Sequence, residues 1–112
     1  MPKTRAQQIM AHKEHRDADQ VTAAIQDIAA EFEPYIIKQR RHFHKHPELS
    51  LQEVRTTSDI AGQLDAMNIP YEQPLETGLI ATLRGTAPDA YREDGTPRRR
   101  LLMRADIDAL PV

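Results

Sequence analysis

Only two segments of the chain have the composition of firm β-strands, and both follow a long stretch with helical periodicity. They are residues 79–83, Leu-Ile-Ala-Thr-Leu, and residues 101–103, Leu-Leu-Met. Two strands cannot cover both faces and both edges of a sheet, so the chain is limited to an α/β arrangement with an incomplete sheet. Side chains such as Leu83 and Met103 then need cover from elsewhere. We therefore expect a marginal fold, or a homo-oligomer that forms through the exposed strand edges.

Apolar residues between Val21 and Phe43 recur at steps of three, four or seven, which predicts one face of an α-helix. Pro34 interrupts this pattern. Proline suits a first helical turn and disfavours helical geometry in the residue before it. Either one helix ends near Glu33 and another begins at Pro34, or a single helix is kinked there. The helical run is expected to end before Pro47.

A second helix is predicted after Ser50. Ser50 and Glu53 have the spacing of a capping box, with Ser50 as the N-cap and Glu53 at position N3. The helix should stop at Asn68, which tolerates the left-handed conformation, just ahead of Pro70. Residues 71–73 then suggest a short edge strand.

The two firm strands are separated by residues 85–97, a surface loop that contains the turn pair Asp94-Gly95. The predicted order is two or three helices followed by a β-hairpin, in which the two firm strands pair antiparallel and both helices lie on one face. Residues 1–20 have no apolar stripe and are expected to form a frayed helix or a flexible tail, ahead of a folded part at 21–112.

Composition narrows the class of protein. The chain has 112 residues, no cysteine and a formal net charge of −2. These values exclude a disulfide framework and thiolate metal sites within the chain, and they give no general attraction to nucleic acid or anionic lipid. No apolar run approaches the roughly 20 residues that span a bilayer, and no apolar core of a secretory signal is present. We therefore expect a cytoplasmic protein with no membrane or nucleic-acid partner.

The first candidate site is the basic, histidine-rich segment at residues 38–46. On a helix, His42 and His46 share a face at i, i+4, a spacing that can hold zinc when further ligands are present, whereas His44 points elsewhere. The segment equally fits a solvated helix C-terminus, where the helix dipole favours cations, or a patch for phosphate or nucleic acid. A stand-alone binding or interaction module built around this basic helix end is the alternative to an enzyme.

Asp106 and Asp108 form the second candidate site. They follow an apolar strand, and strand ends are where α/β proteins often place their sites. A carboxylate at such a place can bind a hard cation or orient a metal-bound histidine. It can equally cap a turn, which is the structural interpretation of the same two residues.

Three motifs in order resemble a known family. Residues 40–49 read RRHFHKHPEL and are similar to the pattern RR-x-x-H-x-x-PEL, which Glu53 and the threonine pair at 56–57 continue as E-x-x-T. Residues 77–85, TGLIATLRG, resemble a first strand with a TG start, and residues 102–111, LMRADIDALP, are close to LRADMDALP. The combination resembles the M20 family of metallopeptidases and amidohydrolases. It is most similar to the N-acyl-amino-acid amidohydrolase branch, which includes hippurate hydrolases and auxin-conjugate hydrolases.

The resemblance implies the N-terminal portion of a zinc-peptidase-like catalytic domain, in a two-domain hydrolase that cleaves the amide bond of N-acyl amino acids or small peptides. In this family a metal-bound water attacks the carbonyl, a glutamate is the general base, and zinc or manganese polarises the oxygen. The position matching Asp108 bridges two metals in the wider family, and the position matching Asp106 is often a histidine ligand. In the amidohydrolase branch, a cysteine farther along the chain takes over the bridging.

The same resemblance implies that the general base and nearly all metal ligands lie beyond Val112. We therefore expect no catalytic residue within the 112 residues, and we expect the isolated chain to be inactive and to bind no metal. Asp106 and Asp108 would be metal ligands of the complete enzyme or groups that orient those ligands. The expected substrate of that enzyme is a small N-acyl amino acid.

Overall fold

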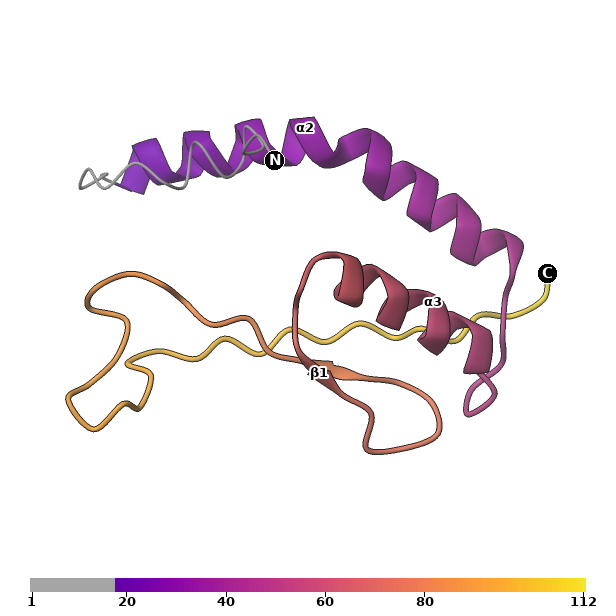
Figure 1. Ribbon diagram of the computed structural model, residues 1–112. Coiled ribbons are helices and arrows are strands. Elements are labelled where there is room, and N and C mark those ends of the chain that lie inside the picture. The colour runs from indigo at the N-terminus through magenta and orange to yellow at the C-terminus, as the bar shows by residue number, and fades with distance from the viewer. Residues whose placement is uncertain (1–17) are drawn as a thin grey trace. The chain divides into compact units, whose positions relative to one another are not determined.

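The computed structural model describes residues 18–112, which divide after Phe43 into two units. The first unit consists of helix α2, Ala18–Lys45, up to that division (Figure 1). The second contains helix α3, Val54–Ala66, and strands β1, Tyr71–Glu72, and β2, Ile80–Ala81. The tail was expected at residues 1–20, of which residues 1–17 lie outside the described residues. Residues 18–20 form the first turn of α2.

Helix α2 continues through Pro34, so one helix and not two occupies this stretch. Figure 1 shows that its ribbon bends along its length, as expected where a proline removes one backbone hydrogen bond. The helix ends at Lys45, which confirms the end predicted ahead of Pro47. None of its residues is buried. Phe32 and Tyr35 make an edge-to-face contact with ring centroids 6.4 Å apart.

Helix α3 begins later than the capping box predicts. Its N-cap is Glu53, which makes no side-chain cap hydrogen bond, and Ser50 lies in the turn before the helix. The physical reason is that Leu51 adopts a left-handed φ of 66°, and its N–H donates to Glu53 Oε1 at 2.9 Å. The Glu53 carboxylate therefore stabilises the turn, and the predicted capping box is wrong.

The C-terminal end of α3 matches the prediction. Met67 is the C-cap, and Asn68 has a φ of 56°, the left-handed conformation that asparagine tolerates. The N–H of Ile69 donates to the carbonyl of Leu64 at 2.9 Å, which satisfies one of the last helical acceptors. The chain then turns at Pro70 into β1.

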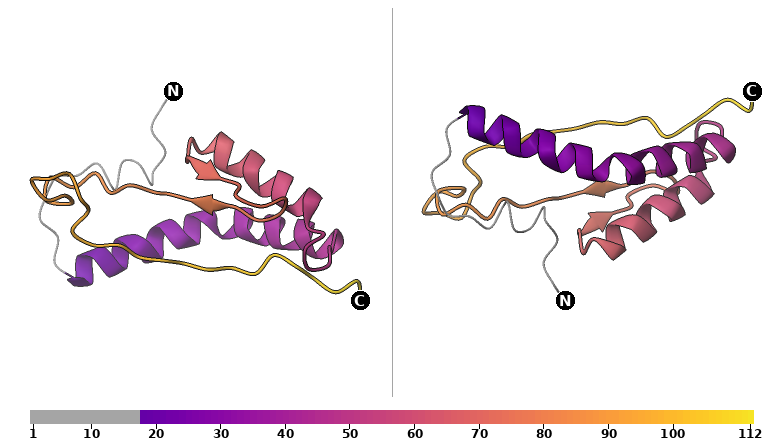
Figure 2. Two further views of the ribbon diagram at one scale, coloured as in Figure 1. Left: turned by 90° about the horizontal axis from the view of Figure 1, so that it is seen from below. Right: turned by 90° about the horizontal axis from the view of Figure 1, so that it is seen from above.

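The sheet is a two-stranded antiparallel hairpin in which Tyr71 pairs with Ala81 and Glu72 with Ile80. The predicted hairpin between residues 79–83 and 101–103 is therefore wrong. The edge strand predicted at 71–73 supplies the partner of β2 instead, because it lies closer in sequence and closes a shorter loop. Two further views show the short strand arrows of this hairpin and the long extended trace that runs on to the C-terminus (Figure 2).

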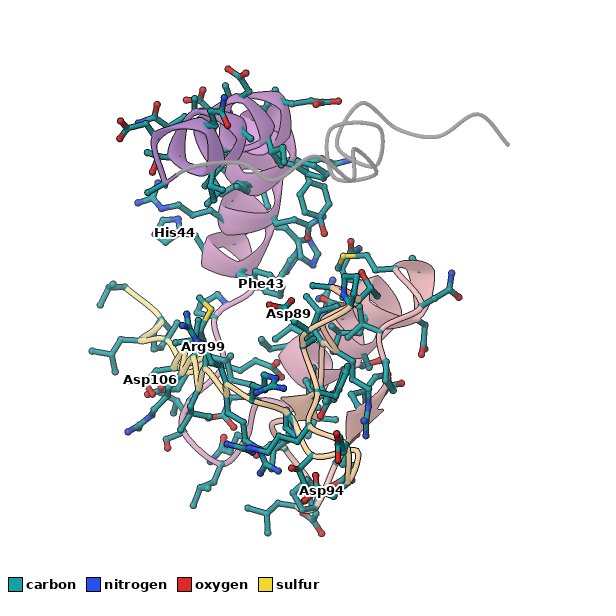
Figure 3. The ribbon with its side chains drawn as sticks, turned by 90° about the vertical axis from the view of Figure 1, so that its left-hand side faces the viewer. Phe43, His44, Asp89, Asp94, Arg99 and Asp106 are labelled. Carbon is teal, nitrogen blue, oxygen red and sulfur yellow. The ribbon has the colours of Figure 1, made fainter. Side chains whose placement is uncertain are left out.

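Residues 85–97 form the predicted loop, with a tight turn at Asp94-Gly95. Gly95 has a φ of 83°, a conformation that glycine adopts without strain, and its N–H donates to the carbonyl of Arg92 at 3.0 Å. Hydrogen bonds from the Thr96 hydroxyl and N–H, at 2.6 and 3.0 Å, lower the pKa of the Asp94 carboxyl. Figure 3 labels Asp94 at this turn.

Burial in the described residues is confined to polar side chains. No hydrophobic side chain of residues 18–112 is buried, whereas Glu53, Thr56 and Thr57 are 6%, 5% and 2% exposed. The fold is thus an α/β arrangement with an incomplete sheet, as predicted. No helix within residues 18–112 combines the length and the apolar character needed to cross a membrane.

Candidate functional site

The centre of the candidate site is the start of α3, where Glu48 acts as the cap that the sequence assigned to Ser50. The Glu48 carboxylate accepts hydrogen bonds from the N–H of Arg55 at 3.2 Å and the N–H of Thr56 at 2.5 Å. It also accepts one from the Thr56 hydroxyl at 2.6 Å. Three donors, two of them among the first amides of the helix, are therefore satisfied by one carboxylate from the preceding segment.

These contacts change the acidity of Glu48. The hydroxyl and the N–H of Thr56 both stabilise the charged form, and they lower the pKa of Glu48 below its ordinary value of 4.5. A negative charge at this end of α3 also complements the helix dipole. Glu48 is thus held as a carboxylate by the helix that it caps.

Thr57, which follows Thr56 in α3, connects the helix to the segment just before β2. Its hydroxyl oxygen accepts the N–H of Gly78 at 2.9 Å. Gly78 has a φ of 83°, which only glycine adopts freely, so the Thr77-Gly78 pair is suited to this close turn. A buried hydroxyl thereby fixes the position where the hairpin returns toward the helix.

The C-terminal segment meets the same point. The N–H of Ala109 donates to the backbone carbonyl of Glu48 at 2.8 Å. Glu48 therefore uses its side chain toward α3 and its main chain toward the segment that carries Asp106 and Asp108. The segments of all three sequence motifs are joined by hydrogen bonds around one helix start.

An open hollow of about 340 Å³ lies beside this junction. Residues from the three segments line it: Ser50, Glu53, Thr77, Gly78, Arg104, Ala105, Asp106, Ile107 and Asp108. Both predicted aspartates thus border one hollow. The sequence had placed them at a strand end, whereas the structure has no strand in residues 101–112.

Asp106 and Asp108 are both exposed. Asp106 Oδ1 lies 3.0 Å from an Arg104 guanidinium nitrogen, in an ion pair whose side chains are 71% and 85% exposed respectively. A pair in this much solvent contributes little to stability. Figure 3 shows Asp106 on the C-terminal segment.

The described residues do not complete a metal site. Nowhere in residues 18–112 do three or more His, Cys, Asp or Glu side chains come together in a way that could hold a metal ion. A catalytic zinc commonly has three protein ligands, so two exposed aspartates are an insufficient set by themselves.

The histidine-rich segment does not form the predicted helical pair. His42 lies within α2, where its ring packs edge-to-face on Phe43 with centroids 5.5 Å apart. α2 ends at Lys45, so His46 lies beyond the helix. The i, i+4 argument therefore does not apply to His42 and His46.

Sequence reasoning missed the roles of Glu48 and Thr57. The usable signal was the spacing of Glu48, a carboxylate just after a proline, eight residues before a threonine in the next helix. The capping-box rule compares residues that are three positions apart. It therefore identifies Ser50 and Glu53 and does not detect a cap from a more distant residue.

Part of the chain is similar in sequence to proteins named as uncharacterized hydrolases. An uncharacterized hydrolase of Staphylococcus aureus (strain bovine RF122 / ET3-1) is 47% identical over 78 residues, which are 70% of this chain and 18% of that protein. An uncharacterized hydrolase of Staphylococcus saprophyticus is 46% identical over 78 residues with the same coverage. The matched part of the chain thus spans about a fifth of the length of these relatives. No family model and no solved structure matches the chain.

Proposed function

We propose that this chain provides the N-terminal segment of a metal-dependent amidohydrolase that hydrolyses the amide bond of N-acyl amino acids or small peptides. The observation that carries the proposal is the junction at the start of α3. There, Glu48, Thr57 and Ala109 join the three motif segments by hydrogen bonds and bring Asp106 and Asp108 to one hollow. The similarity to proteins named as hydrolases supports the same conclusion.

In this proposal the residues of the chain hold other groups in place and do not themselves react with the substrate. Glu48 orients the segment leading to Asp106 and Asp108 through its main-chain bond to Ala109. A bound zinc or manganese ion would polarise the amide carbonyl and lower the pKa of its water. Because the described residues offer two carboxylates and no complete ligand set, the 112-residue chain alone is expected to be inactive.

A chimera tests the proposal. Residues 35–112, which carry the three motifs, replace their counterpart in the Staphylococcus aureus hydrolase. The chimera and the isolated chain are then assayed for amino-acid release from a panel of N-acyl amino acids and small peptides with Zn²⁺ or Mn²⁺. We expect turnover by the chimera, a loss on the order of a hundredfold or more in its Asp108→Asn variant, and none by the isolated chain. Turnover by the isolated 112 residues, or a folded chimera that cleaves neither an N-acyl amino acid nor a small peptide, would reject the proposal.

A further inference from the structure

A second open hollow, of about 410 Å³, lies at the loop that follows β2. Asp89, Arg98 and Arg99 supply its charged side chains, and Tyr91 and Pro97 supply ring surfaces. Figure 3 labels Asp89 and Arg99. None of these residues lines the hollow beside α3. The volume falls within the roughly 300–1,000 Å³ of pockets that bind small molecules, so this hollow has room for a small polar ligand.

Hydrogen bonds within the loop hold the backbone on both sides of the hollow. The N–H of Arg98 donates to the carbonyl of Ala90 at 2.9 Å. Tyr91 pairs with Pro97 in an antiparallel bridge, and its hydroxyl donates to the carbonyl of Gly85 at 2.9 Å. A ligand that binds here therefore meets a loop that is already ordered, which reduces the entropic cost of binding.

The charged side chains at this hollow are not used within the described chain. No hydrogen bond or ion pair joins the side chains of Asp89, Arg98 or Arg99 to any of residues 18–112. By contrast, Arg92 and Asp94 use their side chains in hydrogen bonds within the same loop. Two guanidinium groups and one carboxylate therefore remain for a ligand.

This set of charges favours a ligand with two carboxylates and one ammonium group. A guanidinium group donates two parallel N–H bonds to a carboxylate, and the Asp89 carboxylate can accept hydrogen bonds from an ammonium group. Asp89 would repel a phosphate group. An amino acid with an uncharged side chain would leave one arginine without a carboxylate, and a dicarboxylate without an amine would leave Asp89 unmatched.

We propose that this hollow, which we call the arginine hollow, binds an acidic α-amino acid. The two carboxylates of the ligand pair with Arg98 and Arg99, its ammonium group pairs with Asp89, and its methylene groups lie against the Tyr91 ring. Because the three charged side chains are exposed, we expect a Kd of about 1–10 mM. The proposal is independent of the bond that is hydrolysed, since the two hollows share no residue.

Amide chemical shifts of the full 112-residue chain test the proposal. L-glutamate is titrated at constant ionic strength, because salt screens exposed charges. We expect saturable shifts at residues 85–99, and binding at least about fivefold weaker for glutarate, which lacks the ammonium group, and for inorganic phosphate. The proposal is overturned by no saturation up to about 50 mM glutamate, by shifts outside residues 85–99 alone, or by equal binding of the three ligands.

Two arginines provide a matched pair of variants. Arg99→Gln and Arg41→Gln each remove one positive charge from an exposed side chain, the first at the arginine hollow and the second on α2. We expect Arg99→Gln to weaken glutamate binding about fivefold and Arg41→Gln to change it by no more than about twofold. Equal weakening in both variants would attribute the binding to net charge and reject the proposal.

Asp89→Asn separates an amino-acid site from a general site for anions. The variant removes the partner of the ammonium group and, at the same time, a charge that repels carboxylates. We expect it to weaken glutamate binding about fivefold and to strengthen glutarate binding. Stronger binding of both ligands, or weaker binding of both, would contradict the proposal. The Asp89 side chain is exposed and takes no part in the bonds that hold the loop, so the variant should keep the fold.

Discussion

The start of α3 and the extended segment at residues 99–108 belong to one unit and are organised in opposite ways. At the helix start, polar side chains are buried and bonded, and Thr57 is 2% exposed. In the extended segment at residues 99–108, Leu101, Leu102 and Met103 are exposed, and no backbone hydrogen bond joins the segment to another part of residues 18–112.

The difference follows from what each interaction needs. A hydrogen bond needs one correctly placed partner, and the chain supplies each of them within a few dozen residues. Hydrophobic stabilisation grows with the apolar area removed from water, and a small unit with a two-stranded sheet has little area with which to cover itself. The comparison shows that the unit can form the hydrogen bonds at the start of α3 by itself, whereas it does not bury Leu101, Leu102 and Met103.

Removal of the Glu48 carboxylate should have the largest effect on the start of α3. Glu48→Ala deletes the acceptor of three hydrogen bonds and the charge at the N-terminus of α3. We expect exchange of the Arg55 and Thr56 amides to accelerate on the order of a hundredfold in hydrogen-exchange NMR. Glu76→Ala, which changes an exposed glutamate, is the control and should have no such effect. Unchanged protection in Glu48→Ala would show that the carboxylate is not the cap.

Protonation of Glu48 at low pH should cause the same loss of protection at the start of α3 without a mutation. The folded-state pKa of Glu48 lies below its ordinary value of 4.5, because Thr56 stabilises the carboxylate. Its contribution to stability is therefore complete above about pH 4.5 and is lost as the pH falls through the folded-state pKa. A carbon-13 titration should show the pKa of Glu48 rising toward the ordinary value in Thr56→Val. An identical titration in both proteins would contradict the hydrogen bonds.

Thr57→Val should have the next largest effect. It preserves the shape of the side chain but leaves the N–H of Gly78 without its acceptor. We expect the free energy of unfolding to fall by about 2 kcal/mol in urea denaturation. The matched control is Thr22→Val on α2, where the hydroxyl donates to Ala18 at an exposed position, with an expected change within about 0.5 kcal/mol. Equal changes in the two variants would show that the buried hydrogen bond between Thr57 and Gly78 contributes no more to stability than the exposed one of Thr22.

The end of α3 gives a smaller effect. Asn68 adopts a φ of 56°, so Asn68→Val should destabilise the helix by about 1 kcal/mol, since a β-branched residue disfavours this conformation. Asn68→Gly should be neutral or slightly stabilising, and urea denaturation of the pair provides the comparison. A valine variant as stable as the glycine variant would mean that the left-handed turn is not required.

The smallest effect is expected in the extended segment at residues 99–108. Leu102 is 91% exposed in the isolated chain, so Leu102→Lys should change the free energy of unfolding by no more than about 0.5 kcal/mol. A loss above about 2 kcal/mol in urea denaturation of the isolated chain would show that Leu102 is already buried there. The contrast between the two regions would then fail.

Local signals in the sequence predicted much of the fold. The period of α2, the left-handed stop at Asn68 and the turn at Asp94-Gly95 depend on neighbours within a few residues, and the structure confirms them. The strand at residues 101–103 was predicted from its apolar run, yet it has no partner in the described chain. A strand is defined by pairing, which no local pattern contains.

The candidate site was predicted only in part. The motifs selected Asp106 and Asp108, and the structure places both beside one hollow. The cap at α3 was assigned to Ser50 and not to Glu48, because the contact spans eight residues and depends on the left-handed turn at Leu51. Such a turn brings a distant carboxylate to the helix, and the capping-box rule, which compares residues only three positions apart, does not include it.

Residue-resolved hydrogen exchange on the whole chain tests the central claim most directly. The account predicts protected amides at Arg55, Thr56, Gly78 and Ala109, together with exchange at near-unstructured rates in residues 99–108. Protection at residues 101–103 of the isolated, monomeric chain, with free exchange at Thr56 and Gly78, would contradict it.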